Sequence, residues 1–123
     1  MRLKRWLPAL VWMAAIFIVS DRPPTQLPNF GLIDLLVKKG AHFLSYALLA
    51  WLVQRAWWPG QGSWGWALLI TAVYAISDEY HQTFIPGRSG SVADVLIDIS
   101  GGLTALLLSH WRTHNRYTVI RNP

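Results

Sequence analysis

Residues 92–111 read VADVLIDISGGLTALLLSHW, and this stretch decides the fold. At about 20 residues it is long enough to cross the hydrocarbon core of a bilayer as one helix. Its only acidic residues, Asp94 and Asp98, lie near its start. The stretch therefore predicts a membrane-spanning helix.

Working outward, earlier apolar segments repeat this character, and the composition fits them. Hydrophobic residues make up 53% of the chain and charged residues 14%, whereas soluble domains carry about 25% charged residues. Eight Trp and four Tyr suit the membrane–water boundary. We predict an all-α integral membrane protein, an antiparallel bundle of four transmembrane helices in one domain, 1–123. Its expected spans are residues 6–20, 41–58, 64–80 and 92–111, followed by a cytoplasmic tail, 112–123.

The first segment has a signal peptide as its alternative, because a basic start precedes a short apolar stretch. No A-x-A-like cleavage site precedes Asp21, and further apolar segments follow. A retained membrane anchor is therefore favoured.

The connections between the segments differ in character. Residues 21–28 contain three prolines and are expected to be irregular. Residues 32–39 are apolar on one side and predict a short interfacial helix before the second span. Tight turns are expected at Pro59, Gly60 and Gly62 and at Pro86, Gly87 and Gly90.

Lys and Arg near the span ends predict the orientation. With the N-terminus inside, the inner face holds seven: Arg2, Lys4, Arg5, Arg55, Arg112, Arg116 and Arg121. The outer face holds four: Arg22, Lys38, Lys39 and Arg88. We expect a multi-pass protein of the cell membrane with both termini in the cytoplasm.

Ionisable residues recur at the edges of the apolar segments, and the antiparallel order places them at the extracytoplasmic end. Residues 39, 42 and 46 share one helical face, as do residues 74, 78 and 81. A charge at bilayer depth costs about 2.5–3.5 kcal/mol on insertion scales, so such residues normally pair inside the bundle. We therefore expect a polar pocket with the candidate catalytic residues Lys39, His42, Glu79, His81, Arg88 and Asp94.

Several of these residues also have a purely structural interpretation. Ser91 and Asp94 have the spacing of a capping box, which is as well supported as a role in the site and compatible with it. Lys39 can extend from a helix end to the interface, and Arg88 lies in a Pro-Gly turn where a solvated charge is ordinary. A lone His42 would more often be a hydrogen-bonded core residue.

Two deeper features complete the pattern. Asp98 lies one turn beyond Asp94, and we expect it to form hydrogen bonds within the bundle. Gly101 and Gly102 follow one turn later and are expected to permit close helix packing.

Composition and spacing also exclude several classes of site. The chain has no cysteine, which removes disulfides and thiolate chemistry. His42, Glu79, His81 and Asp94 contain ligand atoms, but Glu79 and His81 are two residues apart and point in different directions, so no metal is expected. No cofactor motif and no nucleic-acid recognition motif is present, so neither a cofactor nor a nucleic-acid partner is expected.

Two sequence blocks carry a family resemblance. Residues 39–46 read KGAHFLSY, and residues 78–88 read DEYHQTFIPGR, followed by Asp94, Asp98 and Gly101. They resemble the K-x-x-H-F-x-x-Y and D-E-x-H-Q-x-F-x-P-x-R patterns of the VanZ-like family of small bacterial membrane proteins. The resemblance covers about residues 5–111, and members often have Asn where this chain has Asp98.

The resemblance implies a role in the cell envelope, and the family is associated with reduced susceptibility to teicoplanin-type antibiotics. Two functions stay open: an enzyme acting on a lipid-linked anionic envelope substrate, or a module that binds such a headgroup or modulates a partner without turnover. A small transporter or proton pathway is less favoured, because the charges are confined to one end of the spans. The expected partners are the lipid bilayer and a lipid-linked cell-wall precursor.

Overall fold

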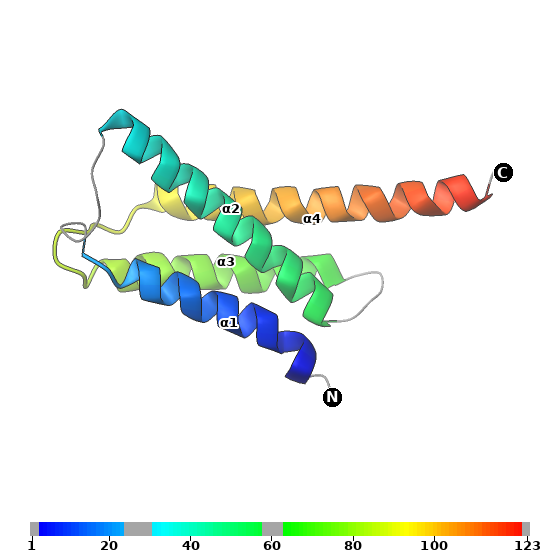
Figure 1. The fold of residues 1–123 in the computed structure, drawn as a ribbon, viewed down its shortest axis with the longest axis horizontal. Helices are drawn as coiled ribbons and strands as arrows, with labels where there is room; N and C mark the ends of the chain where they lie inside the picture. Colours follow the sequence, from blue (N-terminus) through cyan, green and yellow to red (C-terminus); the bar gives the residue numbers. More distant parts are fainter. Residues whose placement is uncertain (1–2, 24–30, 58–62, 122–123) are drawn as a thin grey trace.

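The protein is a bundle of four α-helices (Figure 1), described here from a computed structural model over residues 3–23, 31–57 and 63–121. The helices are α1 (Leu3–Ser20), α2 (Leu32–Trp57), α3 (Ser63–Gln82) and α4 (Val92–Arg121). No strand occurs in these residues, so the predicted all-helical class is confirmed.

Helix α2 is longer than the sequence suggested. The separate interfacial helix predicted over residues 32–39 is instead the N-terminal segment of α2. Gly31, at a positive φ of 72°, precedes the helix, and its carbonyl accepts the first helical bond from the Leu35 N–H at 3.1 Å. An ion pair of 2.6 Å between Asp34 and Lys38, on adjacent turns, then supports this segment. The turn predicted at Pro59, Gly60 and Gly62 lies outside the described residues.

Helix α2 is the centre of the arrangement, because it packs against each of the other three helices. It runs in the same general direction as α4, and in Figure 1 it passes diagonally across α4 and α3. One end of the bundle contains the end of α1, the start of α2, the end of α3 and the start of α4. The chain termini lie at the opposite end. The first of these ends is called the site end below.

Helices α2 and α4 approach very closely at a glycine pair, as the sequence predicted. A Cβ atom on Gly101 would overlap the Phe43 carbonyl oxygen, and one on Gly102 would lie 3.1 Å from the Thr71 side chain. Only glycine permits such backbone contact at position 101. This contact holds α2 and α4 at a fixed distance, and it therefore sets how side chains on α2 face Asp98 on α4, about one turn nearer the site end.

The interior is built from small and medium side chains, and the large apolar ones face outward. The buried core contains Ala9, Ile16, Tyr46, Leu49, Ala50, Val53, Ala67, Ala75 and Leu106. Two polar bonds attach the middle of α1: the Trp12 indole donates to the Ser45 carbonyl at 2.9 Å, and the Tyr74 hydroxyl donates to the Met13 carbonyl at 2.6 Å. By length and hydropathy, α1 and α4 qualify as membrane-spanning helices.

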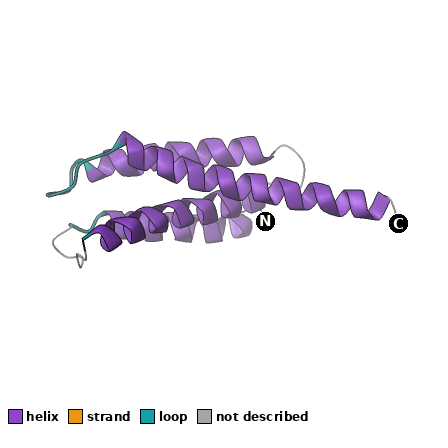
Figure 2. Ribbon diagram, turned by 90° about the horizontal axis from the view of Figure 1, so that it is seen from above, coloured by secondary structure: helices purple, strands orange, loops and turns teal. Residues whose placement is uncertain are grey.

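Helix α4 continues well past the predicted end of its span at residue 111. Its C-terminal segment projects beyond the other helices as a single rod (Figure 2). Residues 110–120 are all exposed.

Candidate functional site

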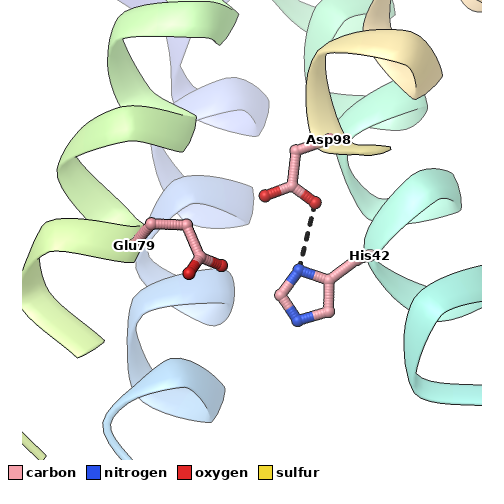
Figure 3. A group of neighbouring side chains, drawn as sticks. All are labelled: His42, Glu79 and Asp98. Carbon is pink, nitrogen blue, oxygen red and sulfur yellow. Dashed lines mark hydrogen bonds and ion pairs between the residues drawn. The ribbon is translucent and has the colours of Figure 1, made fainter. Parts of the chain in front are cut away.

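Three helices bring acid–base side chains together at the site end. His42 on α2, Glu79 on α3 and Asp98 on α4 each place a ligand-type atom within 4.8 Å of the others (Figure 3). The His42 Nδ1 lies 3.1 Å from the Asp98 Oδ1, and the Asp98 side chain is fully buried. These residues, together with Lys39 and Asp94, are called the inner cluster.

Within the inner cluster, Lys39 and Asp94 lie closest to the tip of the site end. They make an ion pair between α2 and α4, with the lysine side chain 36% exposed. Lys39 lies three residues before His42, and Asp94 lies four residues before Asp98. Because α2 and α4 run in the same direction, these spacings stack the ion pair one turn outside the histidine–aspartate pair.

Glu79 has a role that the sequence did not reveal. Its Oε2 accepts the Ser91 backbone N–H at 3.1 Å, so a carboxylate from α3 caps the start of α4. Ser91 is at the N-cap position, as the capping box predicted, since its carbonyl accepts the Val95 N–H at 3.2 Å. The other half of that prediction is wrong, because Asp94, the expected partner of the Ser91 N–H, pairs with Lys39. The second oxygen of Glu79, Oε1, is buried and receives no hydrogen bond from the described residues.

A buried network beside the inner cluster joins α1, α2 and α3. The Asp78 Oδ2 accepts both the Ser20 hydroxyl and the Tyr46 hydroxyl, each at 3.0 Å. The Gln82 amide donates to the Ser20 oxygen at 3.3 Å and accepts from the Arg88 guanidinium at 3.4 Å. These four bonds share residues from one to the next, so the network fixes the end of α1 against the bundle.

A second histidine–aspartate pair lies on the α1 side. The His81 Nε2 is 3.1 Å from the Asp21 Oδ1, and its ring lies 4.7 Å from the ring of Phe17. Arg88 donates to the Arg22 carbonyl at 2.9 Å. The turn that positions it has Pro86 followed by Gly87 at a positive φ of 79°, which favours glycine. Asp21, His81 and Arg88 are called the outer cluster.

The six predicted site residues thus fall into two groups. Lys39, His42, Glu79 and Asp94 lie in the inner cluster, whereas His81 and Arg88 lie in the outer one. The split follows from helical phase, because residues two apart on α3 point about 200° apart. Two buried carboxylates outside the predicted set, Asp78 and Asp98, are central to the geometry. The sequence signal for them was helical spacing: Asp78 lies four residues after Tyr74, and Asp98 lies four residues after Asp94.

An apolar groove leads to the inner cluster from the side of the bundle. It lies between α1 and α2, has a volume of about 280 Å³, and is lined by Trp12, Ala15, Ile16, Val19, Ser20, Ala41, His42, Ser45 and Tyr46. Most of the lining is apolar, and His42 is the lining residue that can carry a charge near neutral pH. The groove therefore connects an outward face of the bundle to the inner cluster.

Comparison with known proteins places the chain in a family. No curated protein and no solved structure matches it significantly. The model of the VanZ/LLP1 family matches residues 5–113, which is nearly the whole chain. The match includes all residues of both clusters, and the chain belongs to the VanZ-like family.

Proposed function

We propose that this VanZ-like protein is a multi-pass protein of the bacterial cell membrane, and that its inner cluster binds or acts on an anionic headgroup of a lipid-linked envelope precursor. The observation that carries the proposal is the grouping of His42, Glu79 and Asp98 within 4.8 Å. Such residues are costly in a membrane interior and are retained where they serve a site.

The outward faces of all four helices support placement in a membrane. Leu10 and Phe17 on α1, Leu44 on α2, Val73 on α3 and Leu107 on α4 are all exposed. Apolar surface that surrounds a whole bundle suits lipid rather than water. This extends the finding that α1 and α4 are long and apolar enough to span.

Aromatic residues mark the opposite end of the bundle as a membrane interface, and the basic residues there support the orientation with both termini in the cytoplasm. Trp57 stacks on Trp66 at 5.6 Å and meets Trp6 edge-on at 5.9 Å. Lys4, Arg5, Arg55, Arg112 and Arg116 belong to the same end. A tryptophan belt together with basic residues is typical of a cytoplasmic interface. The inner cluster would then face the outside.

The chemistry of the inner cluster suits hydrolysis or group transfer at a phosphate or acyl group. The Oε1 atom of Glu79 would take the proton of an attacking water or hydroxyl, and His42, held by Asp98, would return a proton to the leaving oxygen. The ammonium of Lys39, partly exposed, would attract the anionic headgroup. The α1–α2 groove ends at His42 and would hold the adjoining segment of the lipid chain.

Transport fits the interior less well. Among the described residues, the buried polar side chains at the site end are Ser20, Asp78, Glu79, Gln82 and Asp98. Towards the other end the buried polar residue is Thr71, and its hydroxyl is bonded to the Ala67 carbonyl of its own helix. A continuous polar path would need further groups at that depth.

The test uses the purified full chain in detergent with a radiolabelled lipid-linked cell-wall precursor. The enzyme hypothesis expects labelled product from the wild type and none from a folded Glu79→Gln variant. Binding without product, lost in the same variant, would assign the chain to the non-catalytic class. Neither binding nor product with any anionic envelope lipid would disprove the proposal.

The link to antibiotic susceptibility needs its own test in cells. We expect expression of the wild type to lower teicoplanin susceptibility relative to the Glu79→Gln variant at equal membrane abundance. Equal susceptibility of the two strains would separate this chain from that family role.

A further inference from the structure

The inner cluster contains more negative than positive charge. Glu79, Asp94 and Asp98 are three carboxylates, and Lys39 is the one permanent cation, already paired with Asp94. Two carboxyl groups, those of Glu79 and Asp98, are therefore left without a permanent cation, and these residues are 4% and 0% exposed. When both are ionised, two carboxylates at this separation in a low-dielectric interior repel each other, so such a pair either takes up a proton or binds a positive charge.

The unused oxygen atoms show where that charge would bind. The Glu79 Oε1 and the Asp98 Oδ2 are buried, and no donor among the described residues reaches either one. In Figure 3 the Glu79 carboxylate points towards the space between Asp98 and His42, and the second oxygen of Asp98 is turned towards the Glu79 side. A buried carboxylate oxygen without a partner is rare in native proteins, and a bound ion is one of the groups that would satisfy it.

The geometry points to a divalent transition-metal ion, of the zinc or manganese type, held by His42, Glu79 and Asp98. One imidazole nitrogen with two carboxylate oxygens is a donor set that suits these ions. Small side-chain rotations bring donors now within 4.8 Å to about 2.0–2.2 Å from one central ion. The ion would balance the negative charge of the two carboxylates.

This inference revises the expectation that the chain binds no metal, which considered His81 and Asp94 rather than Asp98. Those two residues are bonded to Asp21 and Lys39 and lie outside the donor set. The site is the one in the proposed function, but metal binding does not depend on the headgroup. A bound ion would replace Glu79 as the group that activates water, and Glu79 would then be one of its ligands.

The experiment measures metal uptake directly, without lipid substrate. The full chain, purified through a tag without histidines and stripped with EDTA, is titrated with ZnCl2 or MnCl2 by calorimetry. Because His110 and His114 lie one turn apart on the exposed segment of α4, all proteins carry His110→Ala and His114→Ala to remove a surface zinc site. We expect one ion per chain and a higher unfolding temperature with metal.

The variants decide whether the ion lies in the inner cluster. Glu79→Gln and Asp98→Asn should each weaken metal binding by about tenfold or more, since each removes a charged ligand. Asp78→Asn is the matched control, because Asp78 is also a buried carboxylate with one unbonded oxygen, yet it lies outside the donor set. This control should bind as the parent protein does. Circular dichroism confirms that each variant is folded.

The opposite results are equally clear. No uptake by the parent protein, or equal affinity in all three variants, would overturn the inference. Lipid turnover by metal-free protein would overturn only the role of the ion in activating water, while leaving the proposed function intact. Metal binding without any headgroup binding would support the metal site and contradict the proposed function.

Discussion

The inner and outer clusters contain the same residue types, a histidine beside an aspartate with a basic side chain nearby, yet their surroundings differ. Asp98 is fully buried beside His42, whereas the Asp21 side chain is 57% exposed beside His81. The inner residues come from α2, α3 and α4, while the outer ones extend to the end of α1 and the turn after α3. Motif residues from one block therefore have different surroundings: the inner set is the proposed site, and the outer set contacts the end of α1 where water reaches it.

The largest effect is expected from a substitution that separates α2 from α4, the two helices that carry His42 and Asp98 of the inner cluster. Gly101→Ala would place a methyl group inside contact distance of the Phe43 carbonyl oxygen, so α2 and α4 must separate. We expect a loss of about 3 kcal/mol or more of unfolding free energy, since backbone cannot move aside as a side chain can. Thermal unfolding in detergent, followed by circular dichroism, measures it.

Gly40→Ala is the matched control, because open space surrounds that glycine on α2. It should change the free energy of unfolding by about 1 kcal/mol or less. Equal effects of the two substitutions would show that the close contact does not exist.

The next effect concerns the network between the clusters. Asp78→Ala removes the acceptor of both Ser20 and Tyr46, and the Tyr46 hydroxyl is then buried without a partner. We expect a loss of about 2–3 kcal/mol in the same unfolding assay. Asp78→Asn keeps one acceptor oxygen and should lose less than half as much. An unchanged free energy of unfolding in Asp78→Ala would show that this network does not hold the end of α1.

A functional comparison of the two histidines follows. His42→Ala should weaken binding of the lipid-linked headgroup by about tenfold, as expected for a lost hydrogen bond to a charged group. His81→Ala, directed at the outer cluster, should change it by less than about twofold, since its partner is Asp21. Equilibrium binding of labelled lipid decides between them. The reverse order of effects would move the site to the outer cluster.

The smallest effect is expected at the exposed pair. Asp21→Asn breaks the contact with His81 where water screens the charges, so stability should change by about 0–1 kcal/mol. Added salt should reduce even that difference. A loss above about 2 kcal/mol, measured by the same thermal unfolding, would show that the outer pair is shielded from water.

The sequence predicts the four helices and the end at which the ionisable residues gather, because both follow from hydropathy and antiparallel order. It also predicts the close packing at Gly101. It does not predict the split between clusters, since that depends on how each helix is rotated about its axis. Glu79 and His81 are near neighbours in sequence but face different helices, and only the packed bundle decides that Glu79 meets Ser91 and Asp98.

The length of α4 has a consequence for where the protein can be reached. Its 30 residues, at about 1.5 Å each, form a rod about 45 Å long. A bilayer core about 30 Å thick covers only some two-thirds of such a rod. In the proposed membrane placement, with Asp94 near one surface of the lipid, the last three or so turns would extend into the aqueous compartment on the opposite side. One helix would then hold Asp94 and Asp98 of the proposed site near one surface of the membrane and an exposed segment, residues 110–120, at the opposite surface.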